Sequence, residues 1–313
     1  MNNLSTSQVS IAGTEDLGNG LKASFVINTG LTGTSAFGDR DRFVALEGGF
    51  GSVRIGRFAP DAAKNFHAQS AAVSTNQGSL YGLVSTGSGA NSGGTRFGAL
   101  TGGSFERNDN NVEYKTPSFG GFTVSANYGT SKSDDAALVG EQEATQSGLG
   151  LAYANGPLSI SAGINTRDAN REAVTGTAFV AAVTDRKVKA DLNWVGASYD
   201  LGVAKLFATN VSRKDQVAGA TGPAADINVT ALGVSVPVNA FTFNATAYTG
   251  KDKVGAGSAD DTKLSGYQLS ARYALSKRTS LYALAGENQI KRDGTTGTAR
   301  KETLSAVGVV HTF

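Results

Sequence analysis

The side chains that most enzymes use for catalysis are scarce in this chain of 313 residues. It contains no cysteine and only two histidines, His67 and His311, which stand far apart in the sequence. Cysteine would be needed for a thiol nucleophile, a disulfide framework or a thiolate metal site. The paired carboxylates Asp134-Asp135 and Asp260-Asp261 stand in segments rich in glycine, serine and alanine, where solvated charges are the commoner interpretation. We therefore expect no catalytic, cofactor or metal site.

Two further classes of protein are disfavoured by the composition. The 28 Lys and Arg residues against 26 Asp and Glu give a net charge of +2, so no strong overall field attracts nucleic acid. No run of apolar residues approaches the length of about 18 that a membrane-spanning helix needs. Residues 1–6 show neither the basic region nor the apolar region of a signal peptide.

Alternation of apolar and polar residues with a period of two recurs along the whole chain. Leu21, Ala23 and Phe25 share one face of one such segment. Lys22 and Ser24 take the other face, which is the pattern of a half-buried strand. Because no long segment shows the 3.6-residue period of a helix, we predict an all-β protein with 15 strands. They lie near 8–15, 21–29, 42–47, 52–58, 110–116, 122–128, 148–154, 158–165, 187–199, 203–211, 226–236, 241–249, 263–274, 280–288 and 302–313.

The connections between these strands alternate between short and long. The short ones carry the Gly, Asn, Asp or Pro that a tight turn needs, as in Asn19-Gly20 and Asn155-Gly156-Pro157. A soluble sandwich has no reason to sort its connections in this way, whereas a membrane barrel has short turns on one side and longer loops on the other. The alternation of short and long connections therefore predicts a transmembrane antiparallel β-barrel. The long connections fall near 30–41, 59–109, 129–147, 166–186, 212–225, 250–262 and 289–301.

Aromatic residues gather at both ends of the predicted strands. Two such belts are expected where a membrane barrel meets the two interfaces of the bilayer. The alternative is that these rings plug the ends of a soluble barrel. The residues beside the short turns are Phe50, Phe119, Phe122, Tyr199, Phe241, Tyr273 and Phe313, and those toward the long connections are Phe58, Tyr128, Tyr248 and Tyr267.

The odd number of strands leaves one strand unaccounted for. With 15 strands the chain would begin on the long-loop side and end at Phe313 on the short-turn side. Bacterial single-chain barrels have even strand numbers. We therefore expect that a first strand and a signal peptide are missing before 8–15, which puts in question how the barrel closes against 302–313.

Six short segments, spread over nearly the whole chain, resemble motifs of one protein family. Tyr273–Tyr282 (YALSKRTSLY) is similar to the Y-x-L-S-K-R-T-x-L-Y turn of the Gram-negative general porins. Gly13–Ala23 (GTEDLGNGLKA) resembles their G-[ST]-E-D-L-G-x-G-L-K-A segment. One departure is Asn111, which replaces a serine, and another is the absence of the family's V-T-L-Y-G strand. The remaining similar segments are 50–57, 110–122, 196–202 and the alternating end at 307–313. The chain therefore resembles a general porin of the β-proteobacterial type.

The resemblance implies a single-domain barrel of the 16-stranded type over 1–313. It further implies an integral protein of the bacterial outer membrane, a homotrimer in the lipid bilayer, that passes small hydrophilic solutes and ions by diffusion without a cofactor. Phe313 would be the signal that the outer-membrane assembly machinery recognises. The alternative function is a surface-exposed adhesin or receptor barrel with a plugged or incidental pore.

In these porins the third long loop folds into the barrel and narrows it. Counting the loop that would accompany the missing strand, 59–109 is the third, and we expect it to be the constriction loop. Its Gly- and Ser-rich stretch 85–89 also permits a solvated surface loop. Acidic residues in the loop are few, with Asp61 near its entry and Glu106 and Asp109 at its exit.

Basic residues on the wall that faces this loop are the candidates for selectivity. The resemblance places Arg40, Arg57 and Lys115 among wall-lining positions. Alternation supports Lys22 and Arg54 facing the lumen. Arg57 has the same parity as the aliphatic Val53 and Ile55, so it could face the lumen only if the end of the strand bends or bulges. Each arginine has the alternative of snorkelling to a headgroup or pairing within a loop. A basic wall and an acid-poor loop predict a modest preference for anions. The full set of expected pore-lining residues is Lys22, Arg40, Arg42, Arg54, Arg57, Lys115 and Asp61.

Overall fold

A computed structural model describes residues 7–31, 37–64, 71, 107–133, 142–171, 186–219, 225–253, 261–292 and 300–313. Fifteen β-strands and one four-residue helix, α1 (Asp61–Lys64), make up this part of the chain. None of the helical structure in these ranges is long and apolar enough to cross a membrane. The strands are β1 (Gln8–Gly18), β2 (Leu21–Gly30), β3 (Arg42–Gly48), β4 (Gly51–Phe58), β5 (Asn108–Lys115), β6 (Phe122–Ser133), β7 (Gln142–Asn155), β8 (Leu158–Arg171), β9 (Arg186–Asp200), β10 (Lys205–Val217), β11 (Ala225–Val238), β12 (Phe241–Asp252), β13 (Thr262–Ala274), β14 (Thr279–Arg292) and β15 (Arg300–His311).

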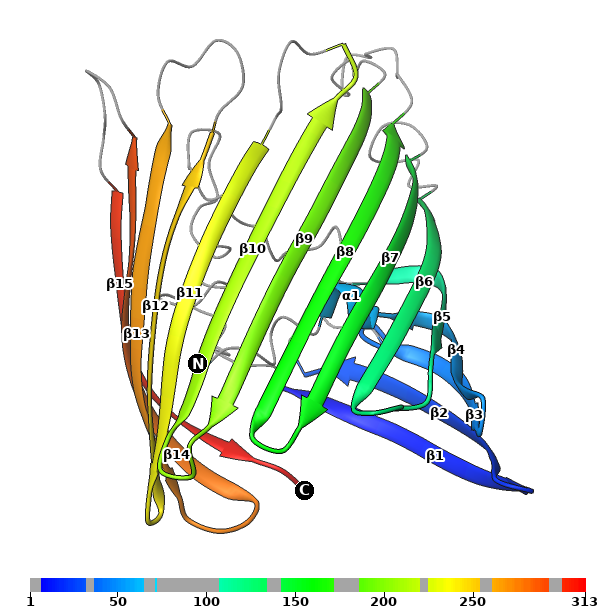
Figure 1. Ribbon diagram of the computed structural model, residues 1–313, viewed down its shortest axis with the longest axis horizontal. Helices are drawn as coiled ribbons and strands as arrows, with labels where there is room; N and C mark the ends of the chain where they lie inside the picture. The colour runs from blue at the N-terminus through cyan, green and yellow to red at the C-terminus, as the bar shows by residue number, and fades with distance from the viewer. Residues whose placement is uncertain are drawn as a thin grey trace.

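All of these strands belong to one sheet in which each strand pairs antiparallel with its neighbours in sequence. The prediction of an all-β protein with 15 antiparallel strands is confirmed. Figure 1 shows the sheet curled, with β1 and β15 at its two edges. Tight turns join the hairpins at one end. In the first of them Asn19 and Gly20 have φ values of 53° and 78°, the left-handed conformation that two-residue hairpin turns require.

One face of the sheet exposes large apolar side chains. Val44, Leu232 and Val307 are 59%, 62% and 82% exposed, the reverse of what a soluble core would show, and this is the face that meets lipid in a membrane barrel. The aromatic belt beside the short turns follows the prediction, since all seven of its rings are exposed. The second belt is partly wrong. Phe58 and Tyr248 are only 1% and 4% exposed, because the register turns them to the opposite, inner face.

Several strands continue further toward the long connections than alternation predicted. β7 begins at Gln142 rather than near residue 148, and β8 ends at Arg171 rather than near residue 165. The added residues pair in unbroken register, Gln142 opposite Arg171. Apart from the opposed pair Ala144 and Ala169 they are polar, so the hairpin extends beyond the band where one face must be apolar.

Candidate functional site: an ion-paired cluster on the inner wall

The inner face is defined by a row of register partners that crosses five adjacent strands. The row comprises Arg54, Glu113, Asn127, Gly148 and Asn165. At its far end the Asn165 side-chain amide donates a hydrogen bond of 2.8 Å to the Ala62 carbonyl of α1. Since register partners share one face of a sheet, Arg54 and Glu113 lie on the side to which α1 is bound.

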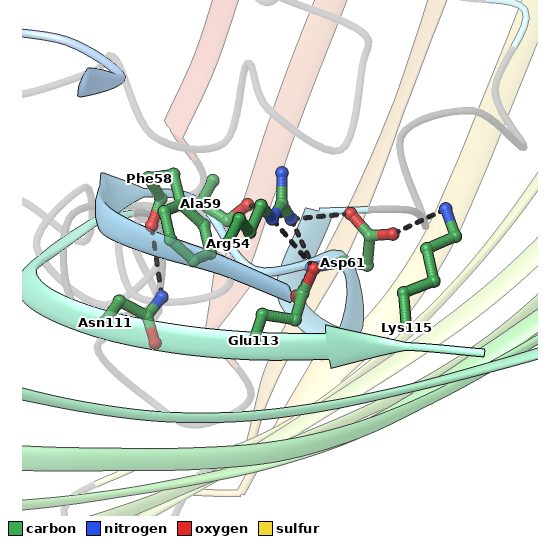
Figure 2. Close-up of polar contacts among 7 residues, drawn as sticks. All are labelled: Arg54, Phe58, Ala59, Asp61, Asn111, Glu113 and Lys115. Atoms are coloured by element: carbon green, nitrogen blue, oxygen red, sulfur yellow. Dashed lines mark hydrogen bonds and ion pairs between the residues drawn. The ribbon is translucent and has the colours of Figure 1, made fainter. Parts of the chain in front are cut away.

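Four charged side chains meet on this face, where β4, β5 and α1 come together (Figure 2). Arg54 donates to Glu113 with its Nε at 2.9 Å and to Asp61 Oδ1 with a terminal nitrogen at 2.8 Å. Lys115 Nζ reaches the other Asp61 oxygen at 2.9 Å. The second Glu113 oxygen accepts the backbone N–H of Asp61 at 2.6 Å. Arg54, Asp61 and Lys115 are among the site residues predicted from the sequence, whereas Glu113 is not. Glu113 stands two residues before Lys115 in the same strand and so shares its face, which is the signal that could have identified it.

The cluster contains two cations and two carboxylates, so its formal charge is zero. The four side chains differ in their exposure to solvent. The Lys115 side chain is 45% exposed and Arg54 20%, whereas Asp61 and Glu113 are 15% and 2% exposed. Arg54 is further held against the ring of Phe58, with its guanidinium carbon 4.2 Å from the ring centroid. Lys115 is thus the most exposed member of the cluster and Glu113 the most buried, with Arg54 and Asp61 between them.

Helix α1 follows β4 in the chain but is hydrogen-bonded to β8 and β9. The carbonyl of Ala62 accepts hydrogen bonds from Trp194 Nε1 at 2.6 Å and from the Asn165 amide, on β9 and β8. Gly163 lies directly beneath, where a Cβ would clash with the same carbonyl and with the Trp194 ring. Further along, a Cβ on Gly233 of β11 would stand 2.9 Å from that of Ala71.

The inner wall also carries a buried apolar cluster on β9 to β13. Its register continues the inner row, because Asn165 is opposite Leu192. A wall that faces only water would be polar in an outer-membrane barrel. These side chains are buried and contact Ala63 of α1 and Ile290. The cluster comprises Ala63, Ala190, Leu192, Trp194, Val211, Ile227, Val229, Ala231, Tyr248 and Leu264.

A second ion pair on the inner face was not foreseen from the sequence. Arg213 binds Asp215 through two hydrogen bonds of 2.7 and 2.9 Å, and its side chain is only 6% exposed. Close by, Arg167 donates to Asn108 Oδ1 at 3.2 Å, and Asn108 donates to Gln146 at 2.8 Å. These residues come from three separate hairpins, so no local spacing in the sequence links them.

The remaining predicted site residues divide between the two faces. Lys22 lies in an inner row, opposite Glu47. Arg42 and Arg57 are opposite each other, in the outer row that contains Ile27. This corrects the expectation that both face the lumen. The β3–β4 register continues without a shift, and the shift in the β4–β5 register between Gly56 and Phe58 leaves Phe58 on the inner face, so Arg57 stays in the outer row. Arg40 lies outside the strands.

The two outer-row arginines have a common partner. Asp109 accepts from Arg57 at 2.6 Å and from Arg42 at 3.4 Å. The Arg40 side chain is half-buried, and its backbone N–H donates to the Asn28 carbonyl at 3.2 Å.

Of the titratable residues considered for chemistry, the structure describes His311 and Asp261. His311 Nδ1 is 2.8 Å from the Thr279 hydroxyl, with its ring against Phe313. Within the described ranges no group of three or more His, Asp or Glu residues could hold a metal ion. His67, Glu106, Asp134-Asp135 and Asp260 lie outside the described residues.

A curled antiparallel sheet with apolar residues outside and charged residues inside is the wall of an outer-membrane channel. The sequence profile of the Gram-negative porins matches residues 1–293, and the chain belongs to this family. It is a protein of the outer membrane that forms a water-filled channel for passive diffusion.

Individual relatives agree with this assignment. Outer membrane porin protein 32 of Delftia acidovorans is 32% identical over 287 residues, which cover 89% of this chain and 73% of the relative. An outer membrane porin protein of Bordetella pertussis is 28% identical, covering 87% of this chain and 74% of that protein. The solved anion-selective porin from Comamonas acidovorans is 27% identical with a TM-score of 0.71, covering 100% of this chain and 91% of its own. These similar proteins are channels, and none favours the adhesin alternative.

Proposed function

We propose that residues 59–109 form the constriction loop of this porin, and that small hydrophilic solutes and ions pass the neck between this loop and the wall with a modest preference for anions. The observation that carries the proposal is the attachment of α1. The chain leaves β4, pairs with β4 and β5 through Asp61, and at the next residue, Ala62, is bound to Trp194 of β9. A surface loop would have no reason to cross the inner face of five strands.

The buried apolar cluster supports the same proposal. Its side chains face inward, yet Val211, Ile227 and Leu264 are no more than 1% exposed. Burying an apolar side chain of this size contributes about 1.5–3 kcal/mol relative to leaving it in water. An inward-folded segment would gain this energy at the wall of β9 to β13, and it would stay there rather than move through the lumen.

The preference for anions is supported by exposure rather than by a surplus of charge. A solute that passes the ion-paired cluster meets Lys115, its most exposed member, whereas Glu113 is almost fully buried. Lys22, in the row of Lys115, is exposed but lies in register between Asp16 and Glu47, so it adds no net positive charge. Water and salt in an open pore screen these charges, so selectivity is partial.

A cysteine-scanning experiment tests the neck, because the chain has no cysteine of its own. Lys115→Cys places a thiol in the lumen, and Lys301→Cys places one on the outer face, where Lys301 pairs with Glu287 at 2.8 Å. We expect an anionic methanethiosulfonate reagent to lower single-channel conductance and reverse the anion preference only in Lys115→Cys. Complete labelling of Lys115→Cys with unchanged conductance would contradict a neck at this position.

We also propose that the porin is a homotrimer and that its protomers meet on the outer face of β1 to β4. An apolar groove of about 750 Å³ lies there. Lipid chains fit such a hollow less closely than complementary protein side chains do. Its lining includes Gly13, Phe25, Val44, Leu46 and Ile55. Unheated electrophoresis should show a trimer that Val44→Arg converts to monomers, whereas a trimer that survives this change would place the contact elsewhere.

Phe313 is proposed to be the residue that the outer-membrane assembly machinery recognises. Its ring is fully exposed and lies edge-on to His311, 4.7 Å between ring centroids. An aromatic ring at the end of an edge strand is accessible to another protein before the sheet is complete, which supports this role.

A further inference from the structure

Three charged side chains stand together on the outer face of β3, β4 and β5. Arg42 and Arg57 are register partners in the outer row, and Asp109 accepts hydrogen bonds from both. We call these residues the outer triad. Its formal charge is +1, because two guanidinium groups share one carboxylate. The side chains of Arg42 and Asp109 are 51% and 45% exposed in the single chain, so a partner can reach them.

The outer triad stands within the height of the apolar band and not above it. Arg42 is six residues before Gly48, where β3 ends at a short turn, and Phe50 of that turn belongs to the exposed aromatic belt. At about 3.4 Å per residue and a strand tilt of about 40°, six residues span about 16 Å along the membrane normal. The apolar band of an outer-membrane barrel is about 25 Å tall. Charged side chains that face lipid at this depth destabilise a barrel.

Other hairpins carry apolar side chains at the same distance from their short turns. In the β7–β8 hairpin the outward pair six residues from the turn is Leu149 and Ile164. In the β11–β12 hairpin the corresponding pair is Leu232 and Ala247. Leu149, Ile164 and Leu232 are each more than half exposed, as expected of side chains that meet lipid. The outer face of β3 to β5 therefore meets a different neighbour at this height.

The apolar groove of β1 to β4 lies directly below the outer triad. Val44 and Ile55 line this groove and stand two residues from Arg42 and Arg57 on the same face. A lipid chain in the groove would bring only hydrocarbon to the triad. A protein surface that fills the groove can also bring a carboxylate, which a guanidinium group removed from water requires. The groove and the triad thus fit one protein partner.

We propose that the outer triad is an ion-pair site between protomers, in which a second copy of this chain covers the triad and places a carboxylate against Arg42 and Arg57. The inference rests on the homotrimer proposed above and extends its contact from the groove to β5. With the added carboxylate, two guanidinium groups face two carboxylates, and the site is neutral. The triad lies outside the channel, so it governs assembly and not ion selectivity.

The rate at which the purified trimer dissociates on heating tests the ion pairs. Arg57→Met removes one charge and keeps a long side chain, Arg57→Lys keeps the charge, and Lys214→Met changes an exposed outer-face lysine of β10 as the matched control. We expect Arg57→Met trimers to dissociate about tenfold or more faster than the parent. Arg57→Lys should lie between the two, and the control should stay within about twofold of the parent. An unchanged rate in Arg57→Met, or equal losses in Arg57→Met and Arg57→Lys, would overturn the proposal.

A single introduced thiol reports what covers the triad, because the chain has no cysteine of its own. Asn110 is exposed on β5 beside Asp109. In detergent, Asn110→Cys should react with N-ethylmaleimide about tenfold or more slowly in the trimer than in the monomer that Val44→Arg produces. Leu232→Cys, on the outer face of β11, should react equally in both.

The possible results separate this proposal from the homotrimer itself. Rapid labelling of Asn110→Cys in an intact trimer would show that the triad faces detergent or lipid. Protection that persists in the monomer would show that a lipid or the same chain covers it, and either result overturns the ion-pair site. A trimer that Val44→Arg dissociates and Arg57→Met leaves unchanged refutes the ion-pair site alone. A trimer that withstands Val44→Arg refutes the protomer contact at the groove, and this inference with it.

Discussion

Replacing Glu113 by glutamine removes the negative charge of the one cluster residue that was not predicted from the sequence, and keeps the shape of its side chain. The Glu113 side chain is 2% exposed, and its two oxygens accept from Arg54 and from the backbone N–H of Asp61. Glutamine keeps the shape and one accepting oxygen, while the charge of the cluster rises from zero to +1. Arg54 keeps its 2.8 Å contact with Asp61, so we expect the barrel to fold with a loss of about 1–2 kcal/mol, less than for a fully orphaned buried charge.

The change in ion selectivity follows from Coulomb's law. One added charge at about 8 Å from a passing ion in water contributes about 0.5 kcal/mol. Screening with a Debye length of about 10 Å at 0.1 M salt reduces this to about 0.2 kcal/mol. Because the anion gains and the cation loses this amount, the ratio of anion to cation permeability should rise about twofold at 0.1 M. At 1 M, where the Debye length is about 3 Å, the rise should nearly vanish.

The zero-current potential in a KCl gradient measures this ratio in planar bilayers. Glu113→Gln should move the potential toward the anion side in dilute KCl. The matched control is Glu287→Gln, which removes a carboxylate paired with Lys301 on the outer face and should leave the potential unchanged. The reasoning is refuted if Glu113→Gln shifts toward cations, if its shift is as large in concentrated salt, or if Glu287→Gln gives the same shift.

Three other variants test separate parts of the structure. Gly163→Val should drive the Ala62 carbonyl from the wall and cost about 2–4 kcal/mol by overpacking, seen as a lower temperature for heat modification on gels; an unchanged temperature would mean that α1 is not held there. Deleting Phe313 should sharply reduce folded barrel in the outer membrane, and an undiminished folded yield would remove its role in assembly. Arg57→Ser should leave the zero-current potential within the scatter of the parent, because Arg57 and Arg42 lie in the outer row. A clear shift toward cations would show that Arg57 faces the lumen.

Much of the fold could be predicted from local patterns. Alternation at Leu21, Ala23 and Phe25 identified a strand and its lipid-facing side, because a strand with one apolar environment must repeat with period two. Turn residues such as Asn19 located the hairpins. Strand ends were less accurate, since segments such as 142–147 have Ala144 as their one apolar residue and show no alternation. The same parity argument put Arg54 and Arg57 on opposite faces of β4, and the register has Arg54 in the inner row and Arg57 in the outer row.

Only the tertiary structure decided what these inward residues meet. Glu113 and Asp61 are 52 positions apart, and Trp194 is 132 positions from Ala62, so their contacts depend on the curl of the sheet. The sequence by itself determined the strands, their faces and the family, because those depend on near neighbours. The tertiary structure determined which charges pair on the inner wall, because only the docking of α1 against the sheet brings Asp61 within hydrogen-bond reach of Arg54, Glu113 and Lys115.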